Sequence, residues 1–120
     1  MEQYAVLLDA VSGRTKAIPF PTNGNSLQFM YDTLGCKLVE CVQIGKDPYG
    51  NSIDAWVDEE GSWSHQDMVH LKTRRGQYNL WGSVLILKSN PEGNTIGFMP
   101  GGLEGMEGVK VAYSHNVIEI

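Results

Sequence analysis

Two stretches near the middle of the chain carry the clearest alternation of apolar and polar residues, and together they predict a β-hairpin. Apolar residues are frequent in 38–44 and again in 53–58, and the segment KDPYGN between them holds Asp, Pro, Gly and Asn, which favour a chain reversal. Alternation in the second run assigns its side chains to two faces. The face expected in the core comprises Ile53, Ala55 and Val57. The face expected to look outward comprises Asp54, Trp56 and Asp58.

Hydrophobic periodicity elsewhere predicts further strands and two helices. Apolar positions spaced i, i+3, i+4 and i+7 over Leu27–Leu34 predict an amphipathic helix closed by Gly35. A second, short helix is predicted from Ser64, which has Asp67 at capping-box spacing, to about Arg74. Strands are predicted at 3–9, 15–20 and 80–88, with shorter closing strands at 95–99, 109–113 and 117–120.

These elements predict an α+β fold: a single small domain, residues 1–120, with a mostly antiparallel sheet and two helices packed on it. The run 80–88 is almost continuously apolar, which is typical of a central strand covered on both faces. Pro19 and Pro21 remove hydrogen-bond donors, so strand 15–20 is expected at an edge. The glycine-rich stretch 93–108 predicts a loop or a mobile lid, because glycine is costly to order.

Composition narrows the class of protein. A chain of 120 residues with 42% hydrophobic and 19% charged residues is expected to be one globular domain. The longest apolar run, 84–87, is far shorter than the roughly 20 residues of a transmembrane helix, and the N-terminus lacks a basic region and a cleavage site. We therefore expect no membrane contact and a cytoplasmic location, with Cys36 and Cys41 reduced.

The net charge of −5 disfavours attraction to phosphate backbones, because proteins that bind nucleic acid normally present a face rich in Lys and Arg. Lys72, Arg74 and Arg75 are the only cationic cluster. Their place at the end of the second predicted helix suits them to its negative dipole end. No nucleic-acid partner is expected.

Residues with catalytic or metal-binding chemistry are present, but their spacing is unfavourable. His65 and His70 are five apart on a predicted helix and would not share a face. Asp67 and His70 are three apart and would form a carboxylate–imidazole pair or supply two ligands, with a plain surface pair favoured. Cys36 follows a helix C-terminus and Cys41 lies within a strand, and neither setting activates a thiol. No cofactor or metal is expected.

The outward face of the hairpin is the least ordinary surface in the sequence. Glu59, Glu60 and Trp63 follow directly after its last residue. Aromatic residues are enriched at interface hot spots, and acidic neighbours steer a basic partner. The competing interpretation is an ordinary charged turn with one half-exposed tryptophan. The candidate binding residues are Trp56, Asp58, Glu59, Trp63 and Trp81.

Three segments, YDTLGCKLVECVQIG, IDAWVDEEG and LWGSVLILK, resemble a family of small uncharacterised domains, a domain of unknown function, found in bacteria, phages and other mobile elements. The similarity covers roughly 25–88, and its specific motif is W-V-D-E-E-G at 56–61. The sequence departs from the family pattern after Ser62 and in the glycine-rich tail. The family has no established activity to transfer. The resemblance implies a small accessory protein of a phage or mobile element, of the kind that binds and inhibits a host component.

These observations lead to one main hypothesis and two alternatives. The main hypothesis is a non-enzymatic binding protein that inhibits or sequesters a host component, counter-defence included. The first alternative is a small-molecule pocket, for instance for a nucleotide signal, closed by the glycine-rich loop. The second is an enzyme that uses His70 with Asp67. The oligomeric state is left open, a homo-oligomer included.

Overall fold

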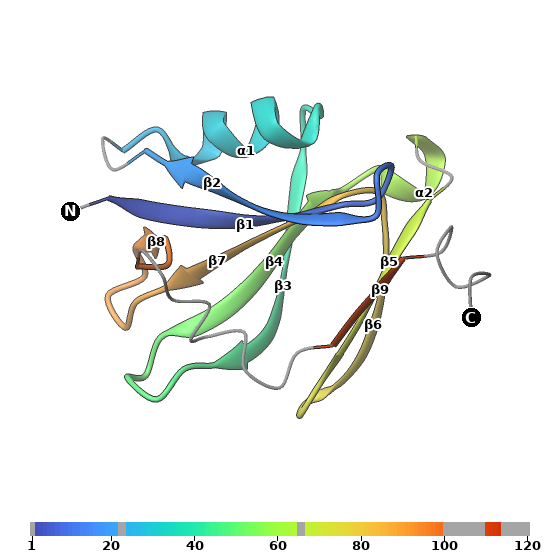
Figure 1. Ribbon diagram of the computed structural model, residues 1–120. Coiled ribbons are helices and arrows are strands. Elements are labelled where there is room, and N and C mark those ends of the chain that lie inside the picture. Colours follow the sequence, from blue (N-terminus) through green and yellow to red (C-terminus); the bar gives the residue numbers. More distant parts are fainter. Residues whose placement is uncertain (1, 22–23, 65–66, 100–109, 114–120) are drawn as a thin grey trace.

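A computed structural model describes residues 2–21, 24–64, 67–99 and 110–113, which form two antiparallel sheets packed face to face (Figure 1). The larger sheet has the strand order β2-β1-β7-β4-β3, and β8 pairs with β7 beside that path. Its strands are β1 (Gln3–Asp9), β2 (Arg14–Phe20), β3 (Val39–Lys46), β4 (Ser52–Asp58), β7 (Val84–Ser89) and β8 (Thr95–Ile96). In the smaller sheet, β5 (Met68–Thr73) lies between β6 (Gly76–Trp81) and β9 (Lys110–Tyr113).

The larger sheet is covered on both faces. One face packs against the smaller sheet, and the core between them comprises Val6, Leu8, Ile44, Ile53, Ala55, Val57, Val69, Leu71, Val84, Ile86, Phe98 and Tyr113, with smaller contributions from neighbours. The other face packs against helix α1 (Ser26–Leu34), whose Met30 and Leu34 lie over Leu85 and Leu87 of β7. Strand β7 therefore contributes alternate side chains to two separate cores.

The predicted α+β class is wrong, because the described chain is dominated by strands. Its helices are α1, of nine residues, and α2 (Gly61–Ser64), of four. Of the two, α1 packs across a sheet face, whereas α2 is a single turn beside the end of β6. The sequence predicted two helices packed on one sheet, whereas the structure has two sheets packed on each other and one helix that covers a sheet face.

The error comes from the stretch expected to be the second helix. Residues 68–73 form β5, and Arg74 and Arg75 form the turn into β6. Val69 and Leu71 are both 0% exposed and fill the core between the sheets, whereas His70 between them is not buried. This period of two, and not the capping signal at Ser64, decides the structure.

Most of the other predicted elements are confirmed with small shifts. Strand β2 lies at an edge, and Gly35, with φ 64°, closes α1. The predicted central strand 80–88 is divided at Gly82, whose φ is 77°. Its first two residues end β6 in the smaller sheet, and its later part is the central β7.

Gly97 and Phe98, within the glycine-rich stretch, pack against β1. Phe98 is 1% exposed and exchanges two backbone hydrogen bonds with Tyr4, at 2.7 and 2.8 Å. Gly97 is required there, since a Cβ would lie 2.9 Å from Tyr4 O. The remainder of the predicted loop, 100–108, and the predicted strand 117–120 lie outside the described residues. Neither described helix is long and apolar enough to cross a membrane.

Candidate functional site

Trp56 does not lie on an open surface. The alternation in β4 is as predicted, with Ile53, Ala55 and Val57 in the core between the sheets. The opposite face, which carries Trp56, is covered by α1, and the half-buried indole packs against the apolar cluster beneath that helix. Within the described part of the chain, its buried Nε1 has no hydrogen-bond partner.

Asp54, expected beside Trp56 on the outward face, is also removed from solvent. It is 4% exposed and accepts hydrogen bonds from the hydroxyls of Ser52 and Ser89. The part of the predicted acidic aromatic surface that reaches solvent therefore begins with Asp58, at the end of β4.

The acidic turn after β4 positions α2. Asp58 Oδ1 accepts a hydrogen bond from Glu60 N at 2.9 Å, and Glu59 N donates to Leu38 O at 3.0 Å. Glu60 O in turn accepts hydrogen bonds from the backbone of Trp63 and Ser64, which closes the single helical turn. Glu59 and Glu60 are exposed, so their charges face solvent on this turn.

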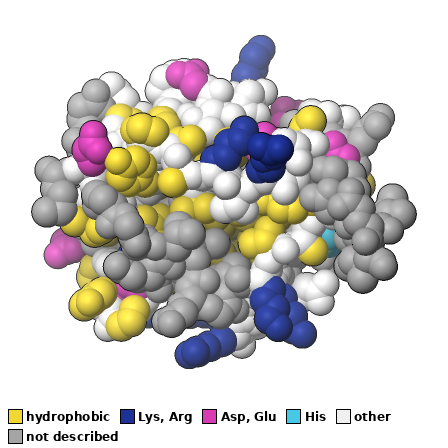
Figure 2. All heavy atoms as spheres, in the orientation of Figure 1, with side chains coloured by type: hydrophobic (Ala, Val, Ile, Leu, Met, Phe, Trp, Pro, Cys, Tyr) yellow, Lys and Arg dark blue, Asp and Glu magenta, His cyan; other side chains and the backbone are white. Residues whose placement is uncertain are grey.

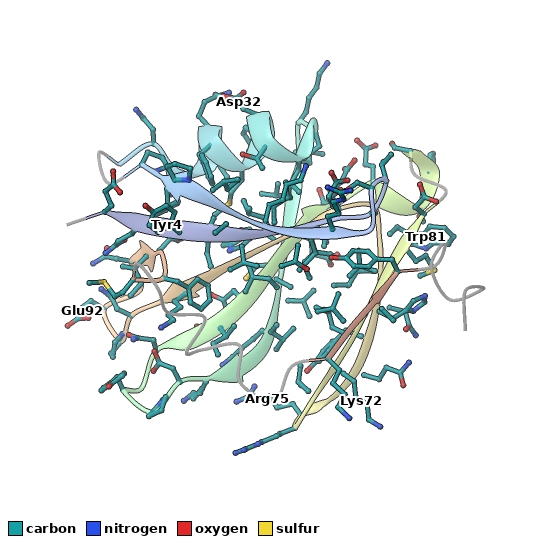
Figure 3. All side chains as sticks on the ribbon, viewed as in Figure 1. Tyr4, Asp32, Lys72, Arg75, Trp81 and Glu92 are labelled. Atoms are coloured by element: carbon teal, nitrogen blue, oxygen red, sulfur yellow. The ribbon has the colours of Figure 1, made fainter. Side chains whose placement is uncertain are left out.

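Gly61 allows α2 to lie directly against β6. A Cβ at this position would be 2.9 Å from Trp81 O and 3.1 Å from Trp81 Cβ. The contact requires a residue without a side chain. It holds α2 against Trp81, which is labelled in Figure 3 and is 38% exposed, and two residues after Gly61 the helical turn carries Trp63, which is 90% exposed.

The turn between β1 and β2 lies at the same end of the molecule as α2. Ala10 N donates a hydrogen bond of 3.0 Å to Ser83 Oγ, directly after Trp81 and Gly82. Val11 follows in that turn and is 78% exposed. We call this surface the α2 end, and it comprises Val11, Asp58, Glu59, Glu60, Trp63 and Trp81. Four of the five predicted binding residues are brought together there, and Trp56 is not among them.

The two thiols are poor nucleophiles in this structure. Burial, reinforced by the charge of Asp58, raises the pKa of Cys36. Burial, reinforced by Asp54, raises the pKa of Cys41 to about 11. Both groups are therefore protonated near neutral pH, and the protonated thiol does not attack.

The suggested pairing of Asp67 with His70 depended on a helix that does not form. His70 lies in β5, where its Nδ1 is 2.8 Å from Asn79 Oδ1 on the neighbouring strand. Asp67 precedes the strand, and its carbonyl oxygen accepts a hydrogen bond from Gly82 N. The described residues hold no cluster of three or more His, Cys, Asp or Glu side chains suited to a metal ion.

A cavity of about 560 Å³ lies at the opposite end of the larger sheet. It is open to solvent, and Phe20 is its aromatic wall. Its lining comprises Gln3, Phe20, Pro21, Gly24, Ser26, Gly93, Asn94, Thr95 and Ile96, so none of the three tryptophans forms part of it. The glycine-rich stretch therefore borders a cavity through its residues 93–96, and the aromatic residue in the lining is Phe20.

Comparisons with known proteins gave no match to any family model, curated protein or solved structure.

Sequence reasoning did not include Val11 in the site. Its only signal was an apolar residue directly before the turn residues Ser12 and Gly13. Which other turns lie beside it depends on the order of strands, and a local pattern does not contain that information.

Proposed function

We propose that the protein is a non-enzymatic binding protein and that its α2 end binds a basic surface on a partner protein. The observation that carries this proposal is Trp63, whose side chain is 90% exposed on a single helical turn. A large indole held in water is unfavourable, and burying it in a partner recovers that free energy. Tryptophan is for this reason among the residues most enriched at interface hot spots.

The neighbours of Trp63 supply the remaining parts of an interface. Trp81 and Val11 add exposed apolar surface, and Gly61 holds the helical turn close to β6. Glu59 and Glu60 place negative charge beside the indole. Acidic groups at the rim of an interface accelerate and orient the approach of a basic partner.

We further propose that the protein belongs to a phage or mobile element and acts in the host cytoplasm, where it inhibits or sequesters a host component such as a defence protein. The support for this context is the resemblance carried by W-V-D-E-E-G at 56–61. In the structure this motif forms the end of β4, the acidic turn and the first residue of α2, Gly61. The high thiol pKa values support a role without nucleophilic catalysis.

Binding of a small molecule is the second candidate. The cavity of about 560 Å³ has a size typical of ligand sites. It is the second candidate because it is open to solvent and Phe20 is the one aromatic side chain in its lining on which a base could stack.

Affinity capture from a host-cell lysate tests the main proposal. Wild-type protein is expected to retain a specific host protein that Trp63→Ala and the double variant Glu59→Lys/Glu60→Lys lose. Tyr49→Ala is the matched control, because Tyr49 is 81% exposed but lies in the turn between β3 and β4. If Trp63→Ala captures the same protein as well as the control does, the α2 end is not the binding surface.

A further inference from the structure

We propose that the outer face of the smaller sheet binds single-stranded nucleic acid. The binding groups are centred on four cations, Lys72, Arg74, Arg75 and Lys110, which we call the cationic strip. This surface is separate from the α2 end, and the inference does not depend on the function proposed above.

The alternation in β5 determines which side chains form this face. Val69 and Leu71 point into the core between the sheets, so His70 and Lys72 point away from it. The register extends the face across the neighbouring strands. Lys72 lies opposite Lys110 on one side and opposite Gln77 on the other. Lys72, Lys110 and Gln77 are all exposed.

The charge on this face differs from that of the whole chain. Although the net charge is −5, the three strands and the Arg74–Arg75 turn contain no Asp or Glu. Figure 2 shows basic side chains at the lower rim of the molecule, where Figure 3 places Lys72 and Arg75. These cations do not end a helix, as the sequence had suggested. Three of them lie on the β5–β6 hairpin and Lys110 lies on β9, and all four are exposed and accessible to phosphate among the residues that the structure describes.

The pairing of two lysines favours an anionic ligand. Like charges on directly opposite residues of paired strands are destabilising. Lys72 and Lys110 occupy such a pair, and the described residues of their three strands supply no carboxylate between them. A phosphate bound between the two ammonium groups would turn this repulsion into two favourable contacts.

The groups beside the cationic strip suit exposed bases. His70 and Asn79 form a hydrogen-bonded pair across β5 and β6, and Gln77 lies one step along the face. Amide side chains hydrogen-bond the edges of bases, and an imidazole ring offers a stacking surface. Ala112, opposite His70, is small, and a shallow groove of about 220 Å³ runs between His70, Lys72 and Lys110.

The shape of the face favours an extended strand over a small ligand. A groove of about 220 Å³ lies below the range of roughly 300–1,000 Å³ in which pockets enclose small molecules. By contrast, the cationic strip continues from β9 across β5 to the Arg74–Arg75 turn, a path that an extended chain can follow from one cation to the next. Bases that are splayed on a sheet must be unpaired, so we infer a single strand.

Fluorescence anisotropy with labelled oligo(dT) and oligo(U) over a series of salt concentrations tests this inference. The test variant is Lys72→Gln/Lys110→Gln. The matched control is Lys37→Gln/Lys46→Gln, which makes the same change in charge at exposed residues before and at the end of β3. Arg74→Gln/Arg75→Gln in the turn is a second test variant. Circular dichroism establishes that each variant is folded.

The wild-type protein is expected to bind, with affinity that falls as salt rises. Each test variant is expected to bind about tenfold more weakly, and to reduce the slope of log affinity against log salt by about 1.4, or about 0.7 for each lost phosphate contact. The control should bind as the wild type does. The inference is overturned if the wild type does not bind either strand at low salt, if the control loses as much affinity as the test variants, or if duplex DNA or polyglutamate binds as tightly as the single strands.

Discussion

The absence of a side chain at Gly61 determines the position of the exposed Trp63 on α2. At Gly61 the backbone approaches β6 so closely that a Cβ would lie 2.9 Å from Trp81 O, inside van der Waals contact. The obstacle is a strand carbonyl, which does not rotate away as a side chain would. The final glycine of W-V-D-E-E-G therefore serves packing, and the tryptophan two residues later owes its position to it.

We expect Gly61→Ala to lower the free energy of unfolding by about 1–3 kcal/mol, because β6 or α2 must move to accept the methyl group. Gly45→Ala is the control, since its Cβ would meet only Ile53 Cδ1, at an ordinary 3.8 Å. Urea denaturation of the two variants measures the difference. Equal effects on stability would show that the close approach of Gly61 to Trp81 does not constrain the packing of α2 on β6.

The alternation of side chains along β4 could be predicted from the sequence, but the covering of Trp56 by helix α1 could not. Alternation alone assigned Ile53, Ala55 and Val57 to one face and Trp56 to the other. Whether that second face is open depends on a helix far away in sequence, whose Met30 and Leu34 close over it. Local periodicity gives the side of the sheet on which a residue lies, but not what covers that side.

We expect fluorescence quenching to separate the buried tryptophan from the exposed ones. In the double variant Trp63→Phe/Trp81→Phe, Trp56 alone emits, and its contacts beneath α1 should shield it from acrylamide and shift its emission to the blue. In Trp56→Phe/Trp81→Phe, Trp63 should be quenched as readily as free tryptophan, because 90% of it is exposed. Similar quenching in both variants would mean that α1 does not cover β4 in solution.

The hairpin β5–β6 shows how two local signals compete. Ser64 with Asp67 has capping-box spacing, whereas MVHLKT alternates between buried and outward positions and is followed by the turn residues Arg74, Arg75 and Gly76. Both patterns are visible in the sequence. The strand prevails because Val69 and Leu71 complete a core with another sheet, and no helix over those residues could present both to it while leaving His70 outside.

A buried ion pair joins parts of the molecule that no local sequence pattern connects. Lys88 Nζ of β7 lies 3.2 Å from Asp47 Oδ2 at the turn after β3, and 4.8 Å from the centre of the Phe98 ring. Asn51 donates to Asp47 from its side chain and its backbone. Asp47 thus ties the β3–β4 turn to the central strand, and Lys88 extends the connection to Phe98, which packs on β1.

This pair predicts a stability that depends on pH. Burial by itself would raise the pKa of Asp47, but the hydrogen bonds from Asn51, Lys88 and Tyr49 outweigh it and hold the pKa below the ordinary 3.8. Because the folded pKa lies below the unfolded one, the stabilisation is complete at neutral pH and is lost as the pH falls below about 3.8.

We expect Asp47→Asn to lower the free energy of unfolding at pH 7 by about 3 kcal/mol, because it leaves Lys88 buried without a counter-charge. Its stability should also fall less than that of the wild type between pH 5 and pH 3, since the titrating group is gone. Urea denaturation across this pH range makes the comparison, with Asp32→Asn on the exposed side of α1 as control. A parallel acid dependence in Asp47→Asn and wild type would exclude Asp47 as its source.

The smaller sheet carries its cations around the β5–β6 turn, whereas the carboxylates of 58–60 lie beside the other end of β6. Along β6 the charge therefore changes from positive at the turn to negative at the other end, and such a local separation of charge helps to orient this sheet towards a charged neighbour before the surfaces touch. We therefore expect the two ends of the smaller sheet to attract groups of opposite charge.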